Sequence, residues 1–268
     1  MFALDSRLKA RLKPVIGRVL IVDSYSQSAR LLVDIMKGMG SGQIVVEPTE
    51  ARAMKTAVEL EPGLVLTERG GQGLNGESLA RAWRRSHMSC RRVPIIMVTA
   101  DATATSIIGA RDAGIHEFLR KPFTSADLLK RVDNVALKPR DWVEAVGYVG
   151  PDRRRFNSGE FSGSGKRKSD KAAKGADLLA ENKDQAMRIL ASALDQFDSD
   201  PPQATRAIRE QAANLKAVAL KLSDSRLVAA VGVLEVSLAT GPASKETLSV
   251  PIGTLLTMHQ AAAPAAAA

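Results

Sequence analysis

The sequence predicts an α/β domain with a five-stranded parallel β-sheet and helices on both faces, followed by a flexible linker and a small all-α helical bundle. Three observations carry this prediction. Between residues 18 and 137, five short apolar runs alternate with segments of helical periodicity. Residues 152–174 are rich in Gly, Ser and Lys and almost devoid of aliphatic side chains. After residue 176, four amphipathic segments follow one another with short joins.

The five apolar runs have the composition of strands that are buried on both faces of a sheet. The first run is continuous and ends in a carboxylate, Asp23. Parallel strands align their carboxyl ends at one edge of the sheet, where such sheets bind ligands. The polar residues at the ends of the runs are Asp23, Glu68, Thr99 and Lys121. The runs lie at residues 18–23, 43–46, 64–67, 94–99 and 118–119.

The intervening segments carry apolar residues at helical spacing. The first spans residues 24–38, and the second spans residues 49–60 with Thr49 as a candidate N-cap. The remaining three run through Leu79 and Trp83, through Ile107, Ile108 and Ala113, and through Leu128, Leu129 and Val132.

Four motifs make residues 18–137 resemble the CheY-like receiver domain of bacterial two-component response regulators. They are Val22-Asp23, the segment from Pro62 to Gly76, Val98-Thr99-Ala100 and Arg120-Lys121-Pro122-Phe123. The resemblance implies a doubly wound sheet of flavodoxin-like strand order. It also implies a role in phosphorelay signal transduction.

The acid site departs from the pattern of that family. In receivers, an acidic pair after the first strand and an aspartate after the third hold Mg²⁺, and that aspartate accepts a phosphoryl group from a kinase histidine. Here Asp23 is followed by Ser24, and Glu68 stands at the phosphoacceptor position. Thr99 and Lys121 match the family pattern.

These departures predict a degenerate receiver, or pseudo-receiver. Ser24 offers only a neutral oxygen, so Mg²⁺ binding at Asp23 and Glu68 should be weak at most, and we expect no other metal or cofactor. Glu68 moves its charge outward by one methylene group, and phosphoryl transfer depends strongly on position. We expect Glu68 to pair with Lys121. Phe118 stands where many receivers have an aromatic residue that couples to the threonine.

The C-terminal part predicts an up-down helical bundle without a catalytic group. Its helical segments lie at residues 177–197, 200–222 and 223–241, with a last helix from residue 244 that Pro251 interrupts. The segment from Arg209 to Ala217 weakly resembles the histidine phosphotransfer domain. Ala213 stands in the place of the phosphorylated histidine, so this resemblance implies docking without relay.

The basic residues concentrate outside the two expected folded parts. The chain has 38 basic and 29 acidic residues, a net charge of +9. Residues 1–18 contain five basic residues and one acidic, and residues 152–174 contain eight and three. We therefore divide the chain into a basic N-terminal lead (1–17), the receiver-like domain (18–137), an extension with a flexible basic linker (138–175), the helical interaction domain (176–260) and a disordered tail (261–268).

Other features exclude several classes of protein. One cysteine and three scattered histidines exclude a disulfide framework and a Cys-rich zinc site. No apolar run is long enough for a membrane span or a signal peptide, so we expect a cytoplasmic protein without membrane insertion. We expect His116 on the surface. Arg84, Arg85, Arg91 and Arg92 should form a solvated helix end.

The sequence predicts a non-enzymatic adaptor that binds a histidine kinase, a phosphotransfer protein or another response regulator. Two alternatives stay open. One is a transcription regulator that binds DNA through the helical half and the basic linker, although residues 175–268 contain eight basic and ten acidic residues. The other is a receiver that can still be phosphorylated.

Overall fold

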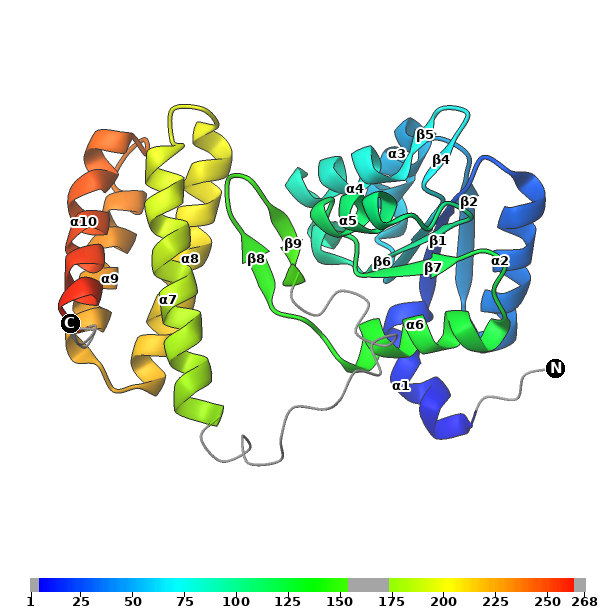
Figure 1. The fold of residues 1–268 in the computed structure, drawn as a ribbon, viewed down its shortest axis with the longest axis horizontal. Helices are drawn as coiled ribbons and strands as arrows, with labels where there is room; N and C mark the ends of the chain where they lie inside the picture. Colours follow the sequence, from blue (N-terminus) through cyan, green and yellow to red (C-terminus); the bar gives the residue numbers. More distant parts are fainter. Residues whose placement is uncertain (1–4, 154–173, 263–268) are drawn as a thin grey trace. The chain divides into compact units, whose positions relative to one another are not determined.

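The computed structural model describes residues 5–153 and 174–262, which form two compact units (Figure 1). Within the described residues, the sheet unit contains residues 5–143 and 148–153, and the helical unit contains residues 144–147 and 174–262. The predicted order of an α/β domain followed by an all-α domain is confirmed. Most of the expected basic linker, and residues 263–268 of the expected tail, lie outside the described residues.

The sheet unit is built on five parallel strands in the order β2-β1-β3-β6-β7, the order that the family resemblance implies. Val22 at the end of β1 is paired with Thr67 at the end of β3. Asp23 and Glu68 therefore follow neighbouring strands at the same edge. The strands are β1 (Arg18–Val22), β2 (Gln43–Glu47), β3 (Leu64–Thr67), β6 (Ile95–Thr99) and β7 (Glu117–Arg120).

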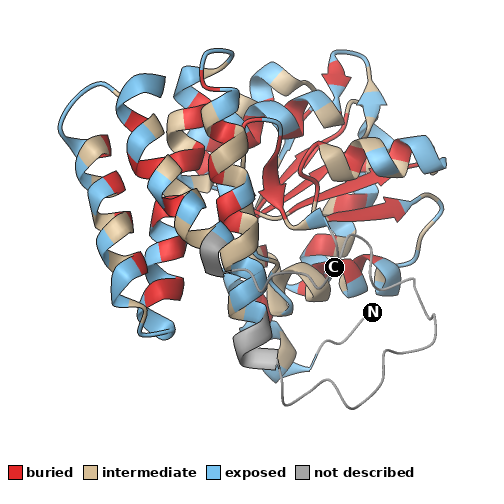
Figure 2. Ribbon diagram, turned by 60° about the vertical axis from the view of Figure 1, so that its left-hand side comes forward, coloured by how far each residue is buried: buried red, intermediate tan, exposed pale blue. Residues whose placement is uncertain are grey.

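Alternate side chains of β1 serve the two faces of the sheet, and Figure 2 shows the central strands as buried. Leu20 and Val22 pack with α3, α4 and α5, whereas Val19 and Ile21 pack with α1, α2 and α6. All four are fully buried, and burial of one such side chain stabilises a fold by about 1.5–3 kcal/mol. The helices are α1 (Ser6–Ile16), α2 (Ser26–Met39), α3 (Glu50–Leu60), α4 (Gly76–Arg85), α5 (Ala104–Asp112) and α6 (Ser125–Leu137).

Part of the expected N-terminal lead is a helix of the sheet unit. Leu12 and Ile16 of α1 are buried in the core that α2 and α6 also line. Their spacing of four residues places them on one face, while the basic residues of this segment occupy the rest of the helix surface. The amphipathic pattern is therefore the physical reason that residues 6–16 belong to the domain.

Two short hairpins lie outside the predicted pattern of strands and helices. The first, β4 (Gly70–Gly71) and β5 (Leu74–Asn75), follows β3. The second, β8 (Trp142–Glu144) and β9 (Val149–Pro151), occupies part of the segment expected to be an extension. Pairs of two- or three-residue strands give too short an alternating pattern to detect in a sequence.

The expectation of a solvated arginine-rich helix end is wrong for Arg84, which is fully buried. Its guanidinium donates to the carbonyls of Gly114, Arg91 and Val93 at 3.0, 2.7 and 2.8 Å. The pKa of Arg84 is lowered to about 9, mainly because the guanidinium is buried. These three backbone acceptors offset the cost of removing the guanidinium from water.

His116 contacts Arg84 and is half-buried, which corrects the expectation of a surface residue. Its Nδ1 lies 3.1 Å from Arg84 Nη2 and accepts a hydrogen bond from the Ile95 N–H at 3.3 Å. Burial, together with the charges of Arg84 and Arg140, holds the pKa of His116 well below its usual value. The imidazole is therefore neutral in the folded protein at pH 7.

The helical unit is a four-helix bundle in which sequence neighbours pack together and α10 also packs on α7. Asp200 and Asp224 cap the second and third helices by accepting from backbone N–H groups. The expected interruption at Pro251 is wrong, because α10 continues through it. Pro251 is buried beside the core residue Ile252, and this packing outweighs the lost backbone hydrogen bond. The helices are α7 (Lys174–Asp195), α8 (Pro201–Lys221), α9 (Ser225–Ala239) and α10 (Lys245–Ala262).

Residues 144–147, between β8 and β9, belong to the helical unit. Val146 is buried in the core of the bundle. Glu144 is fully buried, and its Oε1 and backbone carbonyl accept hydrogen bonds from the side-chain amides of Gln203 and Gln211 at 3.3 and 3.2 Å. A segment that lies 27 to 30 residues before the start of α7 therefore completes the core of this unit.

Candidate functional site

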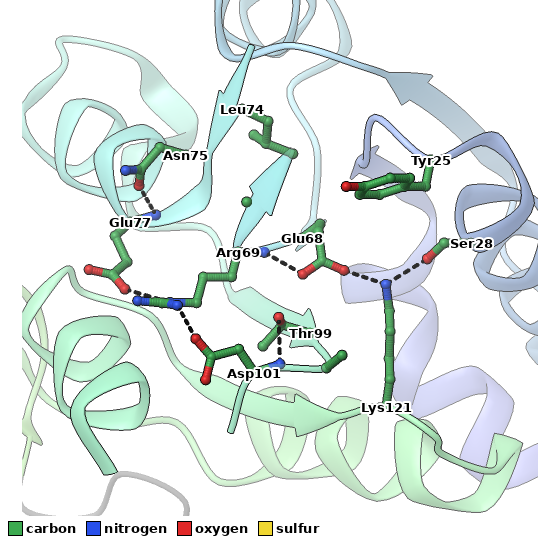
Figure 3. Close-up of a pocket in the computed structure, with 12 residues that line it drawn as sticks. Tyr25, Ser28, Glu68, Arg69, Leu74, Asn75, Glu77, Thr99, Asp101 and Lys121 are labelled. Atoms are coloured by element: carbon green, nitrogen blue, oxygen red, sulfur yellow. Dashed lines mark hydrogen bonds and ion pairs between the residues drawn. The ribbon is translucent and has the colours of Figure 1, made fainter. Parts of the chain in front are cut away.

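The carboxyl edge of the sheet brings together the five residues that the sequence places in a degenerate acid site. Asp23 and Ser24 follow β1, Glu68 follows β3, Thr99 ends β6 and Lys121 follows β7. A cavity of about 610 Å³ opens at this edge (Figure 3). Glu68, Thr99 and Lys121 line the cavity, whereas Asp23 is buried and is not part of the lining.

Glu68 is buried, and both oxygens of its carboxylate are engaged. Oε1 accepts the backbone N–H of Arg69 at 2.8 Å, and Oε2 forms a short ion pair with Lys121 Nζ (Figure 3). Lys121 Nζ also donates to Ser28 Oγ at 2.8 Å. The ammonium group of Lys121 is therefore already paired with a carboxylate of the protein itself.

Asp23 and Ser24, which follow β1, form one corner of the site. Asp23 Oδ1 accepts the Tyr25 N–H at 2.8 Å, and its Oδ2 lies 3.7 Å from Lys121 Nζ. Asp23 Oδ2 and Ser24 Oγ are buried oxygens without a hydrogen-bond partner in the described part of the chain. Buried oxygens of this kind carry a desolvation cost, so this corner is less well satisfied than the Glu68 ion pair.

The donor set at this corner does not fit the Mg²⁺ site that the family resemblance implies. The described residues contain no group of three His, Cys, Asp or Glu side chains that could hold a metal. The carboxylate of Glu68 already binds Lys121, and Ser24 contributes a hydroxyl where a carboxylate is expected. Mg²⁺ prefers carboxylate oxygens in near-octahedral geometry, which one remaining carboxylate does not provide.

The hairpin of β4 and β5 covers this corner, and the sequence pattern did not indicate it. A β-carbon at Gly71 would overlap Ser24 Oγ, so the backbone of the hairpin lies directly against the serine. Leu74 of β5 is buried, and the Asn75 N–H donates to Glu50 Oε1 at 2.7 Å. The glycines at positions 70, 71 and 73 are the only sequence signal for this close approach.

Arg69 is a second residue that the sequence pattern did not single out. Its Nε lies 3.0 Å from Glu77 Oε1, and its Nη1 forms a short ion pair with Asp101 (Figure 3). The pKa of Asp101 lies below its usual value, mainly because Ser106 and Thr103 donate hydrogen bonds to its carboxylate. Arg69 therefore joins the loop after β3 to α4 and to the loop after β6.

Thr99 and Phe118 are both buried. Thr99 Oγ1 accepts the Asp101 N–H at 3.2 Å, so its hydroxyl orders the loop that Arg69 contacts. Phe118 lies in the core shared with α3, α4 and α5.

Among the described residues, no helix is both long and apolar enough to cross a membrane.

Comparison with known proteins relates the sheet unit to a family. Residues 19–133 match the family described as the response regulator receiver domain. The chain is 26% identical over 118 residues to the chemotaxis protein CheY-3 of Vibrio cholerae, a match that covers 44% of this chain and 90% of that protein. It is 30% identical over 115 residues to the DNA-binding response regulator MtrA of Mycobacterium tuberculosis, covering 43% of this chain and 48% of MtrA.

Among solved structures, a putative response regulator from Chloroflexus aurantiacus is 25% identical, with a TM-score of 0.42, and the match covers 45% of this chain and 97% of that one. The chain matches the two curated relatives over less than half of its own length, and it spans about half the length of MtrA. Residues 19–133 form a receiver domain of the response regulator type.

Proposed function

We propose that this chain is a non-catalytic two-component signalling protein whose receiver domain is a pseudo-receiver. It acts as an adaptor through protein–protein contacts and does not pass on a phosphoryl group. Its partner is a histidine kinase, a phosphotransfer protein or another response regulator. The partner contacts α5, β7 and α6, where Ile108 of α5 is half-exposed.

The ion pair between Glu68 and Lys121 is the observation that carries this proposal. A phosphoryl group transferred to an aspartate needs nearby positive charge and donors to stabilise it. In this chain the carboxylate of Glu68 already uses Lys121 Nζ and the Arg69 N–H. A phosphoryl donor would have to break both interactions before its own charge could be stabilised.

The helical unit supports an adaptor role in a second way. Ala213, at the position of the histidine in the weak phosphotransfer resemblance, lies exposed on α8. Its neighbour Lys216 pairs with Glu235 of α9 at 2.6 Å. The surface at this position therefore offers a place to dock but no nucleophile to phosphorylate.

Incubation of the full chain with acetyl phosphate and Mg²⁺ tests the absence of phosphorylation. We expect no label on the wild type, and none on Glu68→Gln, which has no carboxylate at this position. The double variant Ser24→Asp/Glu68→Asp restores three carboxylates and is the reference for a labelled receiver on this scaffold. Stable label at Glu68 in the wild type would overturn the proposal and support the reading of a functional receiver.

Partner capture tests the adaptor role. We compare the wild type with Glu68→Ala and with Ile108→Asp, and we expect only Ile108→Asp to lose a two-component partner. DNA binding by the full chain that weakens steeply with salt would instead support the transcription regulator.

A further inference from the structure

A second cavity of the sheet unit, about 520 Å³ in volume, lies away from the acid site. Pro94 and His116, which line it, immediately precede β6 and β7, so the cavity is at the amino ends of these strands. Asn134 and Val135, from the last turn of α6, line another part, and residues 138–142 complete the lining. The acid site occupies the opposite, carboxyl edge of the same sheet. The two cavities are therefore separate.

Cations predominate in the lining of this cavity. Arg92, Lys138 and Arg140 line it together with two carboxylates, Glu117 and Asp141. Glu117 is buried, and its Oε2 accepts from Arg131 Nη1 at 3.2 Å, so its charge is already matched within the core. Arg92, Lys138 and Asp141 are exposed, and Lys138 Nζ donates to Asn134 Oδ1 at 3.2 Å. Arg140 is half-buried and donates to the Asp152 carbonyl at 3.1 Å.

Trp142 adds a flat aromatic wall and gathers further arginines. The guanidinium carbons of Arg84, Arg91 and Arg92 lie 5.4, 5.8 and 5.2 Å from the centre of its indole ring. These distances are within the range of cation–π attraction, which favours cations near one aromatic face despite their mutual repulsion. Three guanidinium groups therefore lie near this wall of the cavity.

We infer that this cavity binds a small phosphate-bearing anion. Its volume is in the range of small-molecule sites. Arg92 supplies a planar donor fork that matches phosphate oxygens, and Lys138 supplies a flexible ammonium group. The indole of Trp142, near Arg92, also lines the cavity and gives a ring-bearing phosphate a surface to contact. The site does not depend on Glu68 or Lys121, so it stands or falls separately from the proposed function.

Pyrophosphate titration of the full chain in metal-free buffer tests this site. Trp142 is the reporter, because the other tryptophan, Trp83, is fully buried with its Nε1 bonded to the Cys90 carbonyl at 3.0 Å. We expect a saturable change in tryptophan fluorescence, a matching calorimetric isotherm, and weaker binding at high salt. Lys138→Gln and Arg92→Gln should each weaken binding about tenfold, as the loss of one charge-assisted hydrogen bond does.

Lys130→Gln is the matched control, since Lys130 is an exposed lysine of α6 that does not line the cavity. It should bind pyrophosphate like the wild type. The inference is overturned by the lack of a saturable response, or by equal weakening in Lys130→Gln and Lys138→Gln. Thermal unfolding of each variant shows whether it is folded.

Discussion

Gly71 of β4 lies directly against the hydroxyl of Ser24, at a distance that leaves no room for a β-carbon. This contact places the backbone of the glycine-rich hairpin over Ser24, which stands where the family resemblance implies an acid. The oxygen that it covers has no hydrogen-bond partner among the described residues. The hydroxyl of Ser24 is thus covered by the backbone of this hairpin.

Substitution of Gly71 by Ala should displace this hairpin. The new β-carbon would overlap Ser24 Oγ, and overpacking of this kind costs about 1–3 kcal/mol. Gly70→Ala is the matched control, because nothing lies within 4 Å of a β-carbon at Gly70. Urea unfolding should show a lower free energy of unfolding for Gly71→Ala only. An equal loss in both variants would mean that the contact with Ser24 is not the cause.

Replacement of Lys121 by Met should destabilise the sheet unit at neutral pH. Glu68 and Asp23 are both buried, and Lys121 is the cation that lies next to both. Its Nζ forms an ion pair with Glu68 Oε2 and lies 3.7 Å from Asp23 Oδ2. Removal of one partner of a buried ion pair costs about 3–5 kcal/mol, and the partial exposure of Lys121 makes the lower end appropriate. Lys130→Met changes an exposed lysine and should leave the unfolding midpoint unchanged. The double variant Lys121→Met/Glu68→Gln should recover part of the loss.

The pH dependence of stability should carry a contribution from His116. Its pKa is held well below the usual value in the folded protein, mainly by burial, so the unfolded chain binds a proton that the folded chain does not. The free energy of unfolding should therefore fall as the pH drops from 7 through about 6.5, with a slope of up to about 1.4 kcal/mol per pH unit.

His116→Asn keeps a hydrogen-bond acceptor for Arg84 and the Ile95 N–H but has no titrating group. This variant should show a flatter dependence of stability between pH 7 and pH 5. His87 is exposed, and His87→Asn should retain the slope of the wild type. Identical slopes for His116→Asn and the wild type would show that another group titrates in this range.

Val146→Asp should loosen the helical unit although it lies before the linker in the sequence. The side chain is buried in the core of the bundle, where an unpaired charge costs several kcal/mol. Hydrogen exchange of α7, α8, α9 and α10 should become faster. Val250→Asp places the same change at a side chain that is 74% exposed and should have no effect. Unchanged exchange in Val146→Asp would show that residues 144–147 do not support the bundle.

The strands and most helices of the sheet unit could be predicted because each carries its signal locally. β1, β3 and β6 are uninterrupted apolar runs, buried on both faces, and this pattern has few structural alternatives. The same holds for the helix starts at Thr49, Asp200 and Asp224, whose side chains accept from the first helical turn. Asp23, Glu68, Thr99 and Lys121 follow from this, since the ends of parallel strands meet at one edge.

Only the tertiary structure decided which polar residues are buried and what covers the site. Arg84 reads as one of several surface arginines, yet the carbonyls of Gly114, Arg91 and Val93 surround its guanidinium. Gly71 contacts Ser24 although 47 positions separate them in the sequence. Val146 packs in the bundle core although it lies 28 positions before the first helix of the bundle. Periodicity shows whether a helix or strand has an apolar face. It does not show which other element packs on that face, because this depends on how the loops connect the elements in space. The sequence by itself therefore determines the receiver fold, the acids at its edge and the expected pairing of Glu68 with Lys121, whereas packing determines that the backbone of a hairpin covers Ser24.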